Sequence, residues 1–233
     1  MNHTEVIALL ESNRNEKGIQ KWKQQNSRAG ALKSFGIGLT LLRKLAKQVG
    51  RDHALALKLW KSEFYDAKII ALLVDDPKLI TQDQAESQVE NMHQGHLAHV
   101  FSSCGAPLAK TPFVVELACD WMISKNTIRR RCAYGLLYEI SKSKKKNAPD
   151  DAFFLEKIEH ISQSFSVENM IVKASMGGAL MGMGKRNAKL NAAALTVAKA
   201  IGPIPIESDN SSCEPFDAVK HLTSDYIKNK LDV

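Results

Sequence analysis

Apolar side chains recur at helical spacing along almost the whole chain, and no stretch alternates apolar and polar residues like a half-buried strand. In residues 37–49, for example, leucines and an alanine form one stripe while lysine and arginine occupy the opposite face. Prolines, glycines and capping residues separate such segments. The sequence therefore predicts an all-α protein whose helices lie over residues 4–12, 16–25, 37–49, 52–60, 65–74, 81–92, 94–103, 113–123, 126–146, 152–164, 168–183, 187–200 and 216–231.

The predicted helices have ordinary lengths and follow one another in pairs, which is typical of an α-solenoid. Their repeat is not exact, so we interpret the chain as an irregular HEAT-like stack of antiparallel helix pairs, with an unrelated globular helix bundle as the alternative. A stack would line one concave face with its inner helices and form a groove for an extended ligand such as duplex DNA. We expect a single domain over residues 1–233, in which the N-terminal helices and linker of residues 1–33 pack on the repeats.

The composition is that of an ordinary globular protein with an excess of positive charge. The chain holds 32 lysines and arginines against 25 acidic residues, a net charge of +7, which favours acidic partners and nucleic acid above all. No apolar run is long enough to cross a bilayer, and the first residues lack the pattern of a signal peptide. The four cysteines have no CxxC spacing and are interpreted as reduced thiols. We therefore expect a cytoplasmic monomer with no membrane association.

The segment at residues 126–146, NTIRRRCAYGLLYEISKSKKK, carries the most prominent charge pattern. Asn126 suits an N-cap, and the lysines at the far end suit a helix C-terminus. Arg129, Arg130 and Arg131 lie near the positive end of the helix dipole, where cations are unfavourable. A polyanionic partner is one interpretation, and a solvated basic face is the other. Because each residue turns about 100° around a helix, at most one or two of the three arginines can face the same ligand.

A second set of candidate phosphate contacts comprises Lys173, Lys185 and Arg186. Gly182 and Gly184 stand just before Lys185 and could open backbone N–H groups to a phosphate. A helix C-cap followed by an exposed basic loop would explain the same residues equally well. The segment is not a Walker loop, because Gly-x4-Gly-Lys-Ser/Thr is absent.

His93, His96 and His99 follow one another at intervals of three. Residues three apart on a helix are neighbours, but residues six apart diverge, and no cysteine or carboxylate stands beside them in the sequence. We therefore expect no metal site and interpret these histidines as solvated or groove-lining; no cofactor is indicated. Glu116 and Asp120 share one helix face and are interpreted as a salt-bridged face, with a displaced catalytic carboxylate as the alternative. The three tryptophans are interpreted as packing residues.

Four stretches follow the order of one known family. Residues 34–81 combine a leucine–arginine–lysine helix, a Leu-Trp pair and an Asp-Asp-Pro stop; residues 126–137 read NTIRRRCAYGLL; residues 171–202 contain KASMGGAL, GKRN and AKAIG; and residues 211–219 read SSCEPFDAV. Together they resemble the DNA alkylation repair family, the AlkD-like HEAT-repeat DNA glycosylases. The resemblance implies a basic concave groove for double-stranded DNA and, in active members, release of N3- or N7-alkylated purines. Such a base already carries a positive charge while attached and leaves as a neutral molecule, so excision needs a carboxylate beside the sugar more than it needs a general acid.

The sequence departs from the family pattern where that carboxylate is expected. Active members carry a tryptophan–aspartate stretch and then the catalytic aspartate on the helix that corresponds to residues 94–103, QGHLAHVFSS. Here His99 stands near the expected aspartate, and an imidazole cannot stabilise a sugar cation as a carboxylate does. The positions of the family's tryptophans correspond to Thr127 and to Gly177 or Gly178. The resemblance therefore implies DNA binding more strongly than glycosylase activity, and the catalytic residues stay unassigned.

Three hypotheses follow from the sequence. In the first, the protein binds duplex DNA through a basic groove, with phosphates held by Arg129, Arg130 and Lys173 and base excision left open. In the second, it is a protein-interaction scaffold whose groove takes an acidic peptide. In the third, it is an active glycosylase whose carboxylate is Glu116 or Asp120.

Overall fold

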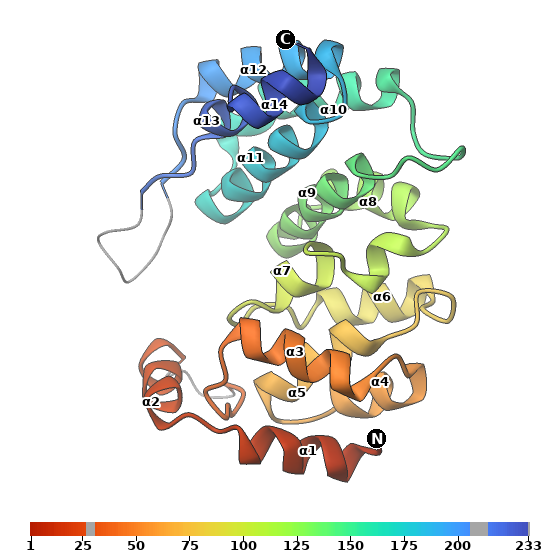
Figure 1. Ribbon diagram of the computed structural model, residues 1–233, viewed down its shortest axis with the longest axis vertical. Coiled ribbons are helices and arrows are strands. Elements are labelled where there is room, and N and C mark those ends of the chain that lie inside the picture. Colours follow the sequence, from red (N-terminus) through yellow and green to blue (C-terminus); the bar gives the residue numbers. More distant parts are fainter. Residues whose placement is uncertain (27–30, 206–213, 233) are drawn as a thin grey trace. The chain divides into compact units, whose positions relative to one another are not determined.

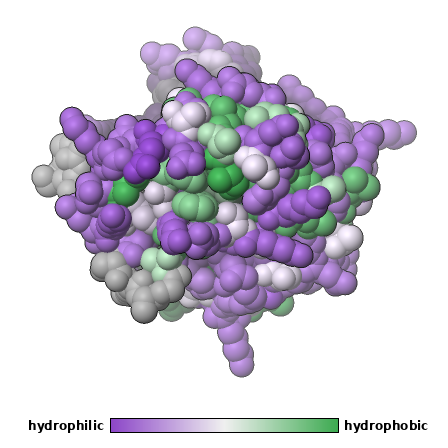
Figure 2. All heavy atoms as spheres, turned by 90° about the horizontal axis from the view of Figure 1, so that it is seen from below, coloured by the Kyte–Doolittle hydropathy of each residue, from purple (hydrophilic) through white to green (hydrophobic). Residues whose placement is uncertain are grey.

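The computed structural model describes residues 1–26, 31–205 and 214–232. Within these ranges the chain forms fourteen α-helices and two short 3₁₀ helices, and its only β-type pairing is two isolated bridges, Lys33 with Phe64 and Ile204 with Phe216 (Figure 1). The predicted all-α class is confirmed. No helix in the described part of the chain is long and apolar enough to span a membrane. Hydrophilic side chains cover most of the face seen in Figure 2, with smaller hydrophobic areas between them.

Two compact units divide the chain, Met1–Phe113 (unit 1) and Val114–Val233 (unit 2). The single domain over residues 1–233 and its continuous concave groove stay predictions.

Unit 1 is built around one buried helix. Its elements are α1 (His3–Ser12), α2 (Glu16–Gln25), α3 (Leu39–Val49), α4 (His53–Trp60), α5 (Tyr65–Val74), α6 (Gln82–Val89), α7 (Leu97–Ser102) and η1 (Pro107–Lys110). Helix α5 packs against α1, α3, α4, α7 and η1. Its sequence, YDAKIIALLV, is apolar nearly all round, which is what a helix surrounded by others requires.

One carboxylate attaches the linker before α3 to α5. Asp66 is fully buried and accepts hydrogen bonds from the Ser34 hydroxyl at 2.8 Å and from the backbone N–H groups of Phe35 at 2.8 Å and Ile37 at 3.1 Å. Burial raises the pKa of Asp66, although the three donors act in the opposite direction. The carboxylate is therefore a structural group that fixes the path of the linker.

Unit 2 contains α8 (Val114–Met122), α9 (Thr127–Ser141), α10 (Asp151–Ser164), η2 (Phe165–Val167), α11 (Met170–Gly184), α12 (Ala188–Ile201), α13 (Ala218–Leu222) and α14 (Asp225–Leu231). Helix α9 packs against α8 and α11, and α12 packs against α10, α11 and α13. Arg130, in the first turn of α9, is paired with Glu168 just before α11. Arg186, just after α11, donates to the carbonyl of Ser141 at the end of α9. Helices α9 and α11 therefore run in the same direction, as alternate helices of antiparallel pairs do.

Most predicted helix bounds agree with the structure to within a few residues, and those of α2 and α5 coincide with it. The helix predicted over residues 94–103 is shorter, because it begins at Leu97. The helix predicted over residues 126–146 ends at Ser141, so the lysine run lies beyond it. The last predicted helix, residues 216–231, is two helices separated at Thr223 and Ser224.

The sequence also predicts Ser166 as the cap of the helix over residues 168–183 and a capping box of Thr81 and Gln84, and the structure differs at both. Ser166 does not cap the helix after it; that helix is α11, and Asn169 accepts a hydrogen bond from Val172 at 3.1 Å. Thr81 caps α6 as predicted, but the Gln84 amide donates to Asp75 at 2.7 Å, so it does not close a capping box. In both places a nearby competing polar group decided the outcome.

Candidate nucleic-acid interface

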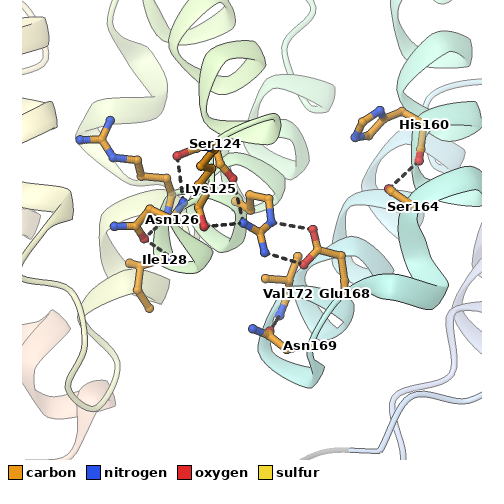
Figure 3. A network of polar contacts seen from close by, with 11 residues as sticks. Ser124, Lys125, Asn126, Ile128, His160, Ser164, Glu168, Asn169 and Val172 are labelled. Carbon is orange, nitrogen blue, oxygen red and sulfur yellow. Dashed lines mark hydrogen bonds and ion pairs between the residues drawn. The ribbon is translucent and has the colours of Figure 1, made fainter.

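The arginine-bearing helix begins as the sequence predicts. The Asn126 side chain accepts hydrogen bonds from the backbone N–H groups of Ile128 at 2.8 Å and Arg129 at 3.3 Å, and the Asn126 N–H donates to the Ser124 hydroxyl at 3.1 Å (Figure 3). This cap satisfies donors that would otherwise lack a partner in the first turn. It thereby fixes where the three following arginines leave the helix.

Arg130 is occupied inside the protein. Its guanidinium is bidentate to Glu168, at 2.6 Å from Nε and 3.0 Å from Nη2, and its Nη1 donates to the carbonyls of Ser124 at 2.7 Å and Lys125 at 3.0 Å (Figure 3). The side chains are 20% exposed for Arg130 and 9% exposed for Glu168. Four of the five N–H donors of the guanidinium are thus in use. Glu168 explains why a cation is tolerated at the positive end of α9.

The other two arginines have different surroundings. The Arg129 guanidinium carbon lies 6.0 Å from the centre of the Trp121 ring, at the outer limit of a cation–π contact. Arg131 is half-buried, and its guanidinium makes no hydrogen bond or ion pair with any described residue. Arg131 is therefore the member of the trio whose donors are open to an external acceptor.

Lys173 lies at the same end of the helix pair as the arginines. It stands in the first turns of α11, its ammonium donates to the Ser166 carbonyl at 3.2 Å, and it lies 5.3 Å from the centre of the Phe165 ring. The Arg130–Glu168 pair joins the starts of α9 and α11 and so brings Lys173 to this end. We call Arg129, Arg131 and Lys173 the N-terminal cation group.

Lys185 and Arg186 lie at the opposite end of α11. Arg186 donates to the carbonyls of Ser141 at 2.5 Å and Ser143 at 3.0 Å, and its guanidinium lies 4.3 Å from the centre of the Phe154 ring. Lys173 and Lys185 are twelve residues apart along α11, or about 18 Å at 1.5 Å per residue. The structure therefore divides the predicted cations of unit 2 into two groups and does not join them in one.

The predicted phosphate-binding glycine segment is not formed. Gly182 and Gly184 lie inside α11 and are buried, so they serve the close packing of helices. A Cβ on Gly182 would meet Tyr138 Cδ2 at 2.6 Å, and one on Gly184 would meet Leu222 Cδ2 at 2.6 Å. Of the two interpretations, phosphate binding by the glycines fails and the helix C-cap agrees with the structure, because the helix continues through both glycines to its C-cap Lys185 and its backbone N–H groups point into the helical hydrogen-bond ladder.

The predicted histidines lie in unit 1. His96 precedes α7, and its backbone N–H donates to the Tyr65 hydroxyl at 3.1 Å. His99 Nε2 lies 3.0 Å from the Sγ atom of Cys104, and the rings of His96 and His99 are 6.4 Å apart. The described residues contain no group of three or more potential metal ligands. The Cys104 contact was missed by the sequence reasoning, which had no signal for it beyond a nearby cysteine.

The remaining candidates on α8 are resolved in part. Glu116 and Asp120 are both exposed, and neither forms an ion pair with a described residue, so the predicted salt bridges are not made there. Trp121 is 1% exposed, which confirms its packing role. Trp22 and Trp60 are half-buried in unit 1.

Comparison with known proteins gives a matching family and a similar fold. Residues 6–210 match the family model of the DNA alkylation repair enzymes. A protein of Listeria monocytogenes serovar 1/2a, uncharacterized protein Lmo0209, is 22% identical over 194 residues, which cover 82% of this chain and 83% of that protein.

A solved structure has a similar fold, with a TM-score of 0.80 and 18% identity over 99% of this chain and 96% of the other. It is described as "A new family of proteins related to the HEAT-like repeat DNA glycosylases with affinity for branched DNA structures". This similarity confirms the predicted HEAT-like fold. Because the matched family model spans most of the sequence, the chain belongs to the DNA alkylation repair enzyme family.

Proposed function

We propose that this protein binds DNA through backbone phosphates and does so without excising a base. The observation that carries the proposal is the contrast between two helices. Helix α9 keeps its arginines, and the Arg131 guanidinium has no partner among the described residues. Helix α7, where the family pattern expects a carboxylate, offers His99 against Cys104. A cationic surface supplies affinity for phosphates, whereas excision of an alkylated purine requires negative charge beside the sugar.

The N-terminal cation group is the proposed phosphate-binding site of unit 2. The excess of 32 basic over 25 acidic residues supplies the long-range attraction. Arg131 has the donors for a phosphate, and Lys173, at the same end of the α9–α11 pair, adds a point charge. Arg130 takes a different part in this proposal from the one first expected: its pairing with Glu168 holds the starts of α9 and α11 together, so it supports the site without donating to DNA.

The preferred form of DNA is also part of the proposal. The similar solved structure belongs to proteins with affinity for branched DNA structures. We infer that a branched molecule competes with duplex DNA for this protein, because phosphate contacts read backbone shape and position and carry no base sequence directly.

Fluorescence anisotropy with a duplex, a fork and a four-way junction of equal strand length would test this proposal. Binding should weaken steeply with salt, because each phosphate contact releases counterions. The double variant Arg131→Gln/Lys173→Gln should bind less tightly than Lys189→Gln/Lys199→Gln, a control with the same charge change on exposed α12 positions. No measurable binding to any of the three DNA forms would refute the proposal and favour the second hypothesis, a protein-interaction scaffold. An acidic peptide should then bind to the protein, and DNA should not compete with it.

Excision requires a separate assay. Duplex DNA carrying N3- and N7-methylated purines should lose no base on incubation with the protein, while DNA binding remains measurable. Release of a methylated base would contradict the proposed loss of excision. In that event Glu116→Gln and Asp120→Gln would be compared, because loss of release with retained binding in one of them would identify the carboxylate.

A further inference from the structure

A concave basic surface lies at the C-terminal ends of α9 and α11, apart from the N-terminal cation group. It is a pocket of about 360 Å³ whose wall also includes α14. Side chains from all three elements meet in it, chiefly Ser143, Lys144, Lys185, Arg186, Tyr226 and Lys230. We call it the basic pocket. It lies entirely within unit 2, and neither the sequence motifs nor the family resemblance assigned it a role as a whole.

The cations of the basic pocket are unevenly satisfied. Lys230 donates from its ammonium to the Lys185 carbonyl at 2.8 Å, and Arg186 caps the end of α9. The ammonium groups of Lys185 and Lys144 make no hydrogen bond or ion pair with any described residue. The helix ends have therefore taken up two of the five cations of the wall, Glu139 pairs with a third, Lys142, and two ammonium groups remain for a ligand.

Among the described residues, only one cation of the pocket wall, Lys142, is paired with a carboxylate. No aspartate or glutamate is among the described residues of the pocket wall. Two carboxylates outside the wall contact its residues. Glu139 forms an ion pair with Lys142 at 2.6 Å, and Asp151 accepts hydrogen bonds from the Asn187 amide at 2.9 and 3.0 Å. Burial first, and then the neighbouring charge of Lys230, lowers the pKa of Lys185. The positive charges crowd one another, and a bound anion would relieve the repulsion.

We propose that the basic pocket holds a second backbone phosphate of DNA, with Lys144 and Lys185 as its direct donors. This inference rests on the proposed function, because it takes the phosphate from bound DNA. The exposed Tyr226 ring, 71% exposed at the rim, offers an apolar surface to the adjoining sugar or base.

Its distance from the N-terminal cation group makes this a separate contact. Lys173 and Lys185 are twelve residues apart along α11, or about 18 Å, which corresponds to about five base-pair steps of 3.4 Å. The two sites would therefore hold phosphates that are far apart on one duplex, or on two arms of a branched molecule. A protein held at two such points is fixed in orientation as well as in position.

The test compares Lys144→Gln/Lys185→Gln with Lys189→Gln/Lys199→Gln. All four lysines lie in unit 2, both variants remove two positive charges, and only the first changes the pocket. Anisotropy at several salt concentrations gives log Kd as a function of log salt, and its slope falls by about 0.9 for each DNA phosphate that the protein no longer neutralises. The pocket variant should therefore have a slope smaller by about 0.9, the value for one lost phosphate contact. Over the tenfold step from about 1 M to about 0.1 M salt, this difference in slope corresponds to binding that is about eightfold weaker than that of the wild type, since 10 to the power 0.9 is about 8. The control should keep the wild-type slope.

Acetylation of lysines with and without DNA gives an independent reading on the wild-type protein. Bound DNA should slow the modification of Lys144 and Lys185 but not of Lys189 and Lys199. Wild-type binding with equal slopes in both variants and no protection would overturn the inference and leave the proposed function standing. Absence of DNA binding by the wild type would refute the proposed function itself. If the pocket variant proves unstable, protection of Lys144 and Lys185 in the wild type would still support the inference.

Discussion

Replacement of Arg130 by glutamine should lower the unfolding free energy of unit 2 by about 3 kcal/mol. The change removes two charge-assisted hydrogen bonds to Glu168, at 2.6 and 3.0 Å, and two bonds to the Ser124 and Lys125 carbonyls. Opposite unit charges about 4 Å apart attract by about 4 kcal/mol at an effective dielectric constant of about 20. The Arg130 side chain is 20% exposed, so solvent screens part of this attraction and lowers its contribution to stability. The Glu168 side chain is only 9% exposed, so its carboxylate would be left nearly buried without an ionic partner, which adds to the loss of stability.

The assay is urea unfolding followed by tryptophan fluorescence. Trp121 is the one tryptophan of unit 2, so it reports on that unit once Trp22 and Trp60 are replaced by phenylalanine. Arg131→Gln is the control for Arg130→Gln, because it removes a neighbouring charge that has no partner among the described residues; it should change stability by less than about 0.5 kcal/mol.

A double-mutant cycle isolates the pair itself. Arg130→Gln and Glu168→Gln should be less than additive, with a coupling energy of about 1–3 kcal/mol. Equal stability of Arg130→Gln and Arg131→Gln would refute the structural role of the pair. If Arg130→Gln also reduced the salt slope of DNA binding at unchanged stability, the guanidinium would be a phosphate ligand after all.

Two further predictions concern packing and burial. Gly182→Ala should lower the unfolding free energy by about 1–3 kcal/mol, because the new Cβ would lie 2.6 Å from Tyr138 Cδ2. Gly178→Ala should instead raise it by up to about 1 kcal/mol, because no atom lies within 4 Å of its Cβ position and alanine favours the helix. Equal urea midpoints for the two variants would contradict this reasoning. Because burial raises the folded-state pKa of Asp66 above its ordinary 3.8, the stabilisation from its protonation is complete below pH 3.8 and is lost as the pH rises through the folded pKa. The stability of the wild type relative to Asp66→Asn, measured by urea unfolding, should therefore fall as the pH rises above 3.8; a rise would mean that the donors, including Ser34, outweigh burial.

Local signals were sufficient for most of the helices. Both bounds of α5 follow from ten residues of mainly apolar sequence and the Asp-Asp-Pro stop after them. The start of α9 follows from the Asn126 cap. Such signals involve neighbours within a turn, which the sequence displays directly. They were insufficient at residues 216–231, where a helical pattern runs across Thr223 and Ser224 although the chain forms two helices there.

The candidate site could be predicted only as a set of charges. The sequence identified Arg130 and Lys173 as cations, but nothing in it indicated that Glu168, 38 residues from Arg130, would neutralise one of them. Likewise the sequence left open whether Gly182 and Gly184 bind a phosphate or end a helix, and their close contacts with Tyr138 and Leu222 place both in a packed helix.

The sequence by itself determined the all-α class, the family and the excess of positive charge, because periodicity, motif order and composition are properties of the chain alone. Tertiary structure decided which cations are available to a ligand. Arg186 and Lys230 are taken up by helix ends, Arg130 by a carboxylate, and the Lys185 ammonium is left open beside them. The physical reason is that a charge is satisfied by whatever polar group folding brings to it, and such partners come from any distance along the chain.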